Sequence, residues 1–248
     1  ETVGGWVRVS SNTFLGLCRS LWNWVTLTGQ NLLGVGTNLK FYIEQGGAYY
    51  DVTPIRRTVT LSNPFSTVIS TAAVTVHDTN HGAAVGDYVT YTSSASVGGL
   101  TISGEYTVTT VIDANSYTIT ASSDASSTVT YPPGGGGTVT AAYQLNIGLP
   151  YSVPLTGWGA GPWSYGGWGI GGTATVALRL WSQSNFGEDL IFAPRGGLIY
   201  YWSAATGLLT RGVALSSLGG TVTITIASPA VVTLSTCLLY TSPSPRDA

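Results

Sequence analysis

The chain has 248 residues, only 8% of them charged, and a formal net charge of −2 at pH 7. A single lysine and few arginines give no basic patch for phosphates, which argues against sequence-specific nucleic-acid binding. No apolar run approaches the length that spans a bilayer, so no transmembrane segment is predicted. So few charges favour assembly into something larger.

The composition predicts an all-β fold, because Thr, Val, Tyr and Trp with 33 glycines favour strands and turns over helices. In chain order, strands are expected first at residues 6–9, 23–27, 32–36, 39–43 and 48–52. The last three are expected to run antiparallel, joined by the turn sequences Thr37-Asn38 and Gln45-Gly46-Gly47. Residues 13–21 fit either a short helix or a buried strand, and Cys18 there is read as a buried small hydrophobe.

Residues 59–146 form a separate, inserted small β-barrel domain in this interpretation. It is set off by Arg56-Arg57 before it and by a linker at 132–137 after it. Its strands alternate, with Tyr106, Val108 and Thr110 on one face, and residues 113–115 make a tight turn.

The segment 147–236 opens with a glycine-rich loop, residues 157–172. Four aromatic side chains in it would be costly to leave in water, so the loop is expected to lie against another surface. The candidate protein interface is therefore Trp158, Trp163, Tyr165 and Trp168. Strands are expected at 174–181 and 222–226, and Trp6, Trp181 and Trp202 are assigned to the core.

A hairpin at residues 180–207 echoes an earlier one. Shifted by 159 residues, Leu39, Phe41, Tyr42 and Ile43 fall on Leu198, Tyr200, Tyr201 and Trp202. Repeated hairpins are typical of radial or stacked β architectures. The fold class is thus all-β, with partial β-propeller-like hairpin repeats in residues 1–58 and 147–236, interrupted by the inserted barrel.

Both ends suggest a fragment. The chain begins at Glu1 and contains no methionine, and CLLYTSPSPRD at 237–247 is similar to the translation of a sequencing-library adaptor. Residues 237–248 are therefore expected to be a non-native tail. Without them Cys18 is the only cysteine, so no intrachain disulfide is expected.

Two groups of residues are candidates for a metal site or a catalytic site. His77 and His81 lie four apart near Asp78, but the alternative to a metal site is one strand histidine and one loop histidine. Glu188 and Asp189 could form a glycosidase pair with a distant carboxylate (Asp51, Glu44 or Glu105). The alternative is a hairpin start in which they cap backbone amides or pair with Arg179 or Arg195. We expect no enzyme, no metal and no cofactor.

Residues 31–58, the Gly/Trp loop and residues 179–202 resemble virion structural proteins of tailed phages, in particular the tail nozzle (tail tubular protein B) of short-tailed phages. That resemblance implies a β-propeller in a hexameric ring below the portal and adaptor, through which DNA leaves. Residues 72–122 are similar to a small β-barrel inserted in many phage structural proteins, and to the first catalytic-cysteine half domain of ubiquitin-activating enzymes. Cys18 lies outside that module, so no catalytic cysteine comes with it.

The expected function is that of a non-enzymatic virion protein, a nozzle-like fragment in the phage tail. Its expected partners are itself as a ring, other tail proteins (adaptor and fibres), and DNA only as non-specific passing cargo. One alternative is an adhesin or fibre-associated module that binds glycans through exposed aromatic rings. A more distant alternative is a propeller glycoside hydrolase.

Overall fold

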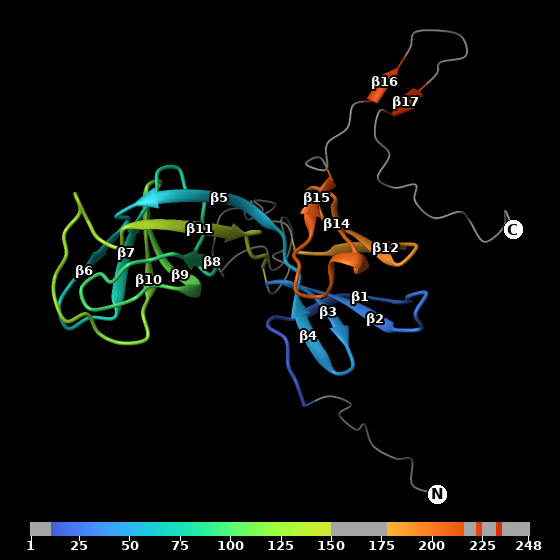
Figure 1. Cartoon of the computed structure of the whole chain (residues 1–248), viewed down its shortest axis with the longest axis horizontal. Coiled ribbons are helices and arrows are strands. Elements are labelled where there is room, and N and C mark those ends of the chain that lie inside the picture. Colours follow the sequence, from blue (N-terminus) through green and yellow to red (C-terminus); the bar gives the residue numbers. More distant parts are fainter. Residues whose placement is uncertain (1–10, 150–177, 216–221, 225–231, 235–248) are drawn as a thin grey trace, which may run out of the picture. The chain divides into compact units, whose positions relative to one another are not determined.

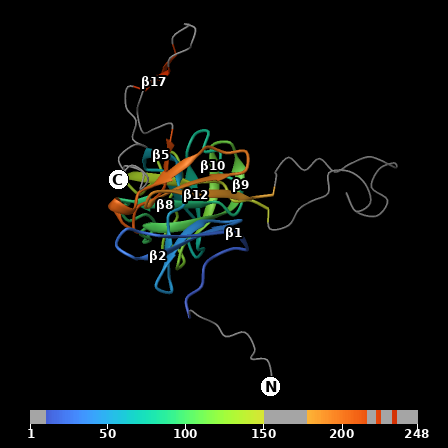
Figure 2. The same ribbon diagram turned by 90° about the vertical axis from the view of Figure 1, so that its right-hand side faces the viewer.

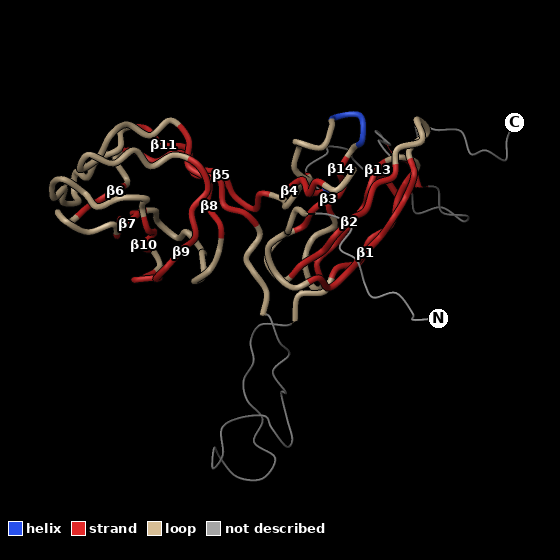
Figure 3. Tube along the Cα trace, turned by 90° about the horizontal axis from the view of Figure 1, so that it is seen from below, coloured by secondary structure: helices blue, strands red, loops and turns tan. Residues whose placement is uncertain are grey.

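A computed structural model describes residues 11–149, 178–215, 222–224 and 232–234. The all-β prediction is confirmed: strands dominate the described ranges, and the helical part described is the short 3-10 turn η1 (Ala204–Thr206) (Figure 3). The chain forms two compact units. The first comprises Glu1–Thr37, Phe41–Val52 and Arg179–Ala248, and the second Asn38–Lys40 and Thr53–Leu178.

The first unit opens with a four-stranded antiparallel meander, here called the first meander (Figure 1). Its strands in sheet order are β1 (Cys18–Val25), β2 (Asn31–Thr37), β3 (Phe41–Gln45) and β4 (Ala48–Asp51). The three antiparallel strands predicted between residues 32 and 52 are confirmed. The burial predicted for Cys18 is wrong: this residue starts the edge strand and is exposed.

A second meander of the same kind belongs to this unit. Its strands in order are β12 (Trp181–Phe186), β13 (Asp189–Pro194), β14 (Tyr200–Trp202) and β15 (Val213–Ala214). Both hairpins of the predicted repeat are therefore present. Farther along, β16 (Val222–Ile224) and β17 (Val232–Leu234) pair antiparallel. The strand predicted at 6–9 and the glycine-rich loop lie outside the described residues.

The two meanders pack face to face around aromatic rings. The ring of Phe41 stacks on Phe192 with centroids 4.1 Å apart and meets the Trp181 ring edge-on at 4.9 Å. Gly36 allows this close approach, because a Cβ there would lie 2.5 Å from Trp181. In Figures 1 and 2, β12 lies over β1 and β2. Trp181 and Trp202 are buried, as predicted.

The second unit contains a curled seven-stranded antiparallel sheet. Its strands in sheet order are β5 (Ile55–Ser62), β11 (Thr138–Gln144), β8 (Tyr88–Thr92), β9 (Gly104–Asp113), β10 (Ser116–Thr120), β7 (Ala73–His77) and β6 (Phe65–Thr67). Bridges from Phe65 to Gly135 and from Thr67 to Val129 join β6 to the segment that leads into β11. These contacts close the sheet into a barrel.

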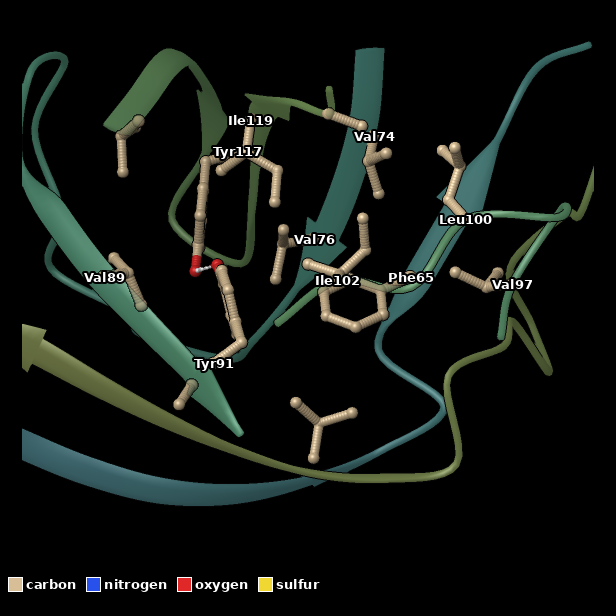
Figure 4. Packing of buried hydrophobic residues seen from close by; sticks show 14 of the residues in the cluster. Phe65, Val74, Val76, Val89, Tyr91, Val97, Leu100, Ile102, Tyr117 and Ile119 are labelled. Atoms are coloured by element: carbon tan, nitrogen blue, oxygen red, sulfur yellow. Dashed lines mark hydrogen bonds between the residues drawn. The ribbon is translucent and has the colours of Figure 1, made fainter. Parts of the chain in front are cut away.

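Strand alternation fills the barrel with apolar side chains (Figure 4). In β9 the alternation breaks, because Ile119 pairs with Val108 while Thr118 pairs with Thr110, which leaves Thr109 as the extra residue of a β-bulge. Val111 rather than Thr110 therefore packs against the core. The predicted face for Thr110 is wrong for this reason. The tight turn at 113–115 is confirmed.

The glycine run after the two prolines is part of the barrel and not a linker. Phe65 and Gly135 exchange two backbone hydrogen bonds, at 3.1 and 2.8 Å. Gly134 has φ +74°, and a Cβ there would lie 2.2 Å from the carbonyl oxygen of Asn63. The run is thus a close-packed turn that only glycine fits.

Replacing Gly134 by alanine is expected to destabilise the barrel by about 1–3 kcal/mol, from backbone strain together with the clash. Gly104→Ala is the matched control, since Gly104 also has positive φ but has nothing within 4 Å of its Cβ position. Urea unfolding of both variants should show the larger loss for Gly134→Ala. Equal losses would mean that the contact with Asn63 relaxes without cost.

Candidate functional site

A chain of hydrogen bonds between tyrosines crosses the barrel interior. Tyr91 Oη and Tyr117 Oη are 2.5 Å apart (Figure 4), Tyr117 Oη and Tyr143 Oη are 2.9 Å apart, and Tyr143 Oη donates to Asp78 Oδ2 at 2.5 Å. All three rings are fully buried. Burial raises the pKa of Tyr117 to about 12 and raises the pKa values of Tyr91 and Tyr143.

This hydrogen-bond network ends at an ion pair between Arg57 and Asp78. Arg57 donates from Nη1 and Nη2 to the two carboxylate oxygens of Asp78, at 2.6 and 2.9 Å. The Asp78 side chain is 2% exposed and that of Arg57 30%. The hydrogen bond to Asp78 raises the pKa of Arg57. Such a bidentate pair compensates a buried carboxylate, so its role here is structural.

His81 is buried beside this network and makes fixed contacts through both ring nitrogens. Its Nδ1 accepts the Ala83 N–H at 2.9 Å, and its Nε2 lies 2.9 Å from the Asp113 carbonyl oxygen. These contacts assign the neutral tautomer with the proton on Nε2. The nitrogens of His81 are thus occupied by protein groups.

His77 lies in a different setting, at the end of β7. Its ring stacks on Tyr131 at 4.0 Å between centroids and 10° between planes, and Nε2 lies 3.0 Å from Ser66 Oγ. Tyr131 is 48% exposed. An exposed tyrosine ring held against a second ring, with hydroxyl groups beside it, is suited to stacking on an apolar ligand face.

Burial lowers the pKa of His77, and the nearby Asp113 opposes this shift. The unfolded chain, with a histidine pKa of about 6.5, therefore binds the proton first as the pH falls. The stabilising contribution of His77 is complete above about pH 6.5 and is lost as the pH falls towards its folded pKa. Between about pH 7.5 and about pH 5, we expect the melting temperature of the His77→Gln variant to fall less than that of the parent protein. Parallel losses in both proteins would contradict this.

The acidic pair is tied to backbone amides, as the hairpin interpretation predicts. Gly187 turns the chain with φ +62°. The Glu188 carboxylate accepts the Leu27 N–H, and Asp189 Oδ1 accepts the Ala204 N–H at 2.8 Å. Tyr201 also donates to Asp189.

The three distant carboxylates considered as glycosidase partners of Glu188 and Asp189 also form hydrogen bonds or ion pairs within the protein. The Glu105 carboxylate accepts two hydrogen bonds from the buried Lys40 ammonium, at 2.6 and 2.8 Å. The Lys40 Nζ lies 4.4 Å from the centroid of the Tyr88 ring. Glu44 accepts the Gly47 N–H at 2.6 Å, and Asp51 pairs with Arg211 at 3.3 Å.

Three further observations concern the predicted sites. In the ranges with described structure, no three His, Cys, Asp or Glu side chains gather where they could hold a metal. Nor does that part of the chain contain a helix long and apolar enough to cross a membrane. Trp158, Trp163, Tyr165 and Trp168 lie outside the described residues, so their interface role stays a prediction.

The barrel is the part of the chain that matches a known protein family. Residues 58–133 match the family model of the β-barrel domain of bacteriophage endosialidase. This range begins within β5 and ends at the glycine run, and it contains the exposed Tyr131. The match supports a bacteriophage tail or fibre protein, and a location in the phage tail or fibre.

Among solved structures, the chain is similar to the endosialidase of phage phi92, with 13% identity and a TM-score of 0.34. The similarity covers 85% of this chain and 39% of that protein, so the chain spans well under half of the phage enzyme. No curated protein matches the chain. The predicted likeness to ubiquitin-activating enzymes is not supported, and the tail nozzle stays a prediction.

Sequence reasoning missed Tyr131 and the Arg57–Asp78 pair. The only local signal for Tyr131 was its place before two prolines, which restrict the preceding residue to extended backbone. Arg57 and Asp78 are 21 residues apart and meet only once the barrel closes.

Proposed function

We propose that the chain is part of a non-enzymatic virion structural protein of a tailed phage. The stacked meanders would act as the scaffold and the barrel as an inserted accessory module. The observation that carries this proposal is the match of residues 58–133 to a phage β-barrel domain, placed in a chain whose other unit is made of four-stranded meanders. Four-stranded meanders are the units of β-propellers.

The specific form of the proposal is a tail nozzle-like component that lines part of the DNA exit channel. It would assemble with itself as a ring and with the adaptor and fibres of the tail. A net charge of −2 and few positive side chains suit a channel through which DNA passes without sticking. The Trp-rich loop would dock on the neighbouring subunit.

A structural role also agrees with the state of the acidic residues. Glu188 and Asp189 each accept a hydrogen bond from the backbone N–H of another segment, as carboxylates with a structural role do. We therefore expect no glycan hydrolysis by the chain. Turnover that disappears in Glu188→Gln or Asp189→Asn, with folding intact, would favour the hydrolase alternative.

The proposal is tested by immunogold electron microscopy of virions of the source phage, with antibodies raised against the chain. Gold at the distal end of the tail tube is the expected result. Gold confined to fibre tips would overturn the nozzle in favour of an adhesin. Virions that carry no gold, confirmed by mass spectrometry of purified particles, would overturn the virion role altogether.

A second candidate is a glycan-binding module, favoured by the exposed Tyr131 ring stacked on His77 in a barrel of the endosialidase kind. The name endosialidase suggests sialylated glycans as the class to test. On a glycan array, binding that is lost in Tyr131→Ala and kept in Tyr106→Phe would support this candidate. Absence of binding by the parent protein would reject it.

A further inference from the structure

The single lysine of the chain, Lys40, is buried beside the barrel. It lies in the short connection between β2 and β3, and residues 38–40 of this connection belong to the same compact unit as the barrel. Asn38 fixes the connection: its carbonyl oxygen accepts the Gly148 N–H at 2.7 Å, and its side-chain amide donates to the Gly148 carbonyl at 3.4 Å. Lys40 is therefore held near the end of β11.

Gln144, the last residue of β11, carries a buried amide that is bound at one end. The residue is 1% exposed, and its amide nitrogen donates to Glu105 Oε2. This contact fixes the orientation of the amide, because only its NH2 group can donate to a carboxylate. The other end, Oε1, is buried without a hydrogen-bond partner among the residues that the structure describes. Buried polar atoms are nearly always paired, so packing alone does not account for this amide.

The carboxylate of Glu105 brings the lysine and the amide together. Lys40 Nζ donates to Glu105 Oε1 at 2.6 Å and to Oε2 at 2.8 Å, and Oε2 is also the oxygen that accepts the Gln144 amide. The amine and the amide thus meet at one carboxylate oxygen. Tyr88 borders the site, with its ring centroid 4.4 Å from Nζ. A nucleophilic amine, an acyl group and a carboxylate that can carry protons between them are the groups that transamidation needs.

We propose that Lys40 and Gln144 form an isopeptide bond, with Glu105 as the proton carrier. Nζ transfers a proton to Glu105 and attacks Gln144 Cδ as the free amine. Glu105 gives this proton to Nε2 as the Cδ–Nε2 bond breaks. It then takes the second proton that Nζ loses on becoming an amide, and passes it to the ammonia, which leaves as ammonium. One C–N bond forms and one breaks, and nothing is oxidised or reduced.

Burial of the site favours this reaction. Holding amine and amide against one carboxylate makes their encounter intramolecular. Lys40 and Gln144 are 3% and 1% exposed, so water is kept from competing for the amide carbon. The Glu105 side chain is 32% exposed, which leaves the ammonium a path to solvent. The bond closes residues 40–144, which contain the barrel, into a covalent loop, and such a cross-link stabilises a fold by restricting its unfolded chain.

Mass spectrometry of the full chain tests the bond. The parent protein is expected about 17 Da below the mass of its sequence, because it has lost one ammonia. Trypsin cuts after a lysine only if the amine is free, so the unfolded parent should stay uncut after Lys40. Glu105→Gln and Lys40→Arg are both expected at the full mass of their sequences. Glu105→Gln should also be cut after Lys40.

The matched control is Glu44→Gln, which removes a carboxylate that accepts the Gly47 N–H in the first meander. It should keep the mass deficit and stay uncut after Lys40. Circular dichroism shows whether each variant is folded. A folded parent protein that has the full mass of its sequence and is cut after Lys40 would overturn the proposal, and so would a deficit that persists in folded Glu105→Gln. The bond does not depend on the virion role, which the labelling of virions tests separately.

Discussion

Replacing Arg57 by methionine is expected to lower the free energy of unfolding of the barrel by about 3–5 kcal/mol. The reason is the carboxylate of Asp78, whose side chain is 2% exposed and which takes both nitrogens of Arg57 at 2.6 and 2.9 Å. Without Arg57 the carboxylate charge stays buried, and the Tyr143 hydroxyl still donates a hydrogen bond to it. Urea unfolding monitored by circular dichroism measures the loss.

A double-mutant cycle separates the pair from its surroundings. Asp78→Asn in the Arg57→Met background removes the uncompensated charge, so the double variant should lose less than the sum of the single losses. Arg195→Met, at an exposed arginine of the other unit, serves as the control and should change little. A loss below about 1 kcal/mol for Arg57→Met would show that the pair behaves like an ordinary surface ion pair.

Raising the pH above 10 is expected to unfold the barrel. Burial holds the pKa of Tyr117 at about 12 and raises the pKa values of Tyr91 and Tyr143, whereas unfolded tyrosines ionise near pH 10. The stabilising contribution of the three neutral phenols is complete below pH 10 and is lost as the pH rises above it. Each phenol that stays neutral in the barrel while its unfolded counterpart ionises lowers the free energy of unfolding by about 1.4 kcal/mol per pH unit above 10.

Ultraviolet absorbance of tyrosinate measures this together with circular dichroism. Of the 14 tyrosines, the exposed ones should ionise first, and the buried three should ionise only as the strand signal disappears. Tyr91→Phe should reduce the steepness of alkaline unfolding, while Tyr131→Phe, at an exposed ring, should not. Ionisation of every tyrosine near pH 10 with the strands intact would contradict the prediction.

Local sequence signals predicted much of the fold. The hairpin that joins β3 to β4 turns at Gly46 and Gly47, which adopt positive φ at little cost, and the hairpin at Gly187 follows the same rule. The acidic pair after Gly187 was also read correctly as a source of backbone caps. The turns and the Asp189 cap depend on interactions within one hairpin or its flanking residues, whereas the amide that Glu188 caps, the Leu27 N–H, lies 161 residues away.

The wrong predictions concern features that depend on residues far apart in the sequence. Cys18 sits in an apolar run, but its exposure follows from being at the edge of a sheet. Thr110 faces outward because the partner strand skips Thr109. The glycine run was read as a linker because its partners, Asn63 and Phe65, lie about 70 residues earlier in the sequence.

By itself the sequence determined the all-β class, the turns and the inserted barrel region, because strand preference and turn chemistry are short-range properties of the chain. Tertiary structure alone decided how Arg57, Asp78 and the three tyrosines meet, since closing a barrel joins residues from distant strands. It also decided that the meanders stack in the same direction. The shift of 159 residues pairs Phe41 with Tyr200, and both rings lie against Phe192 between the two meanders. Strand direction across a packed interface has no local signature, because the contacts that fix it, such as that of Trp22 with Asn185, join residues far apart in the sequence.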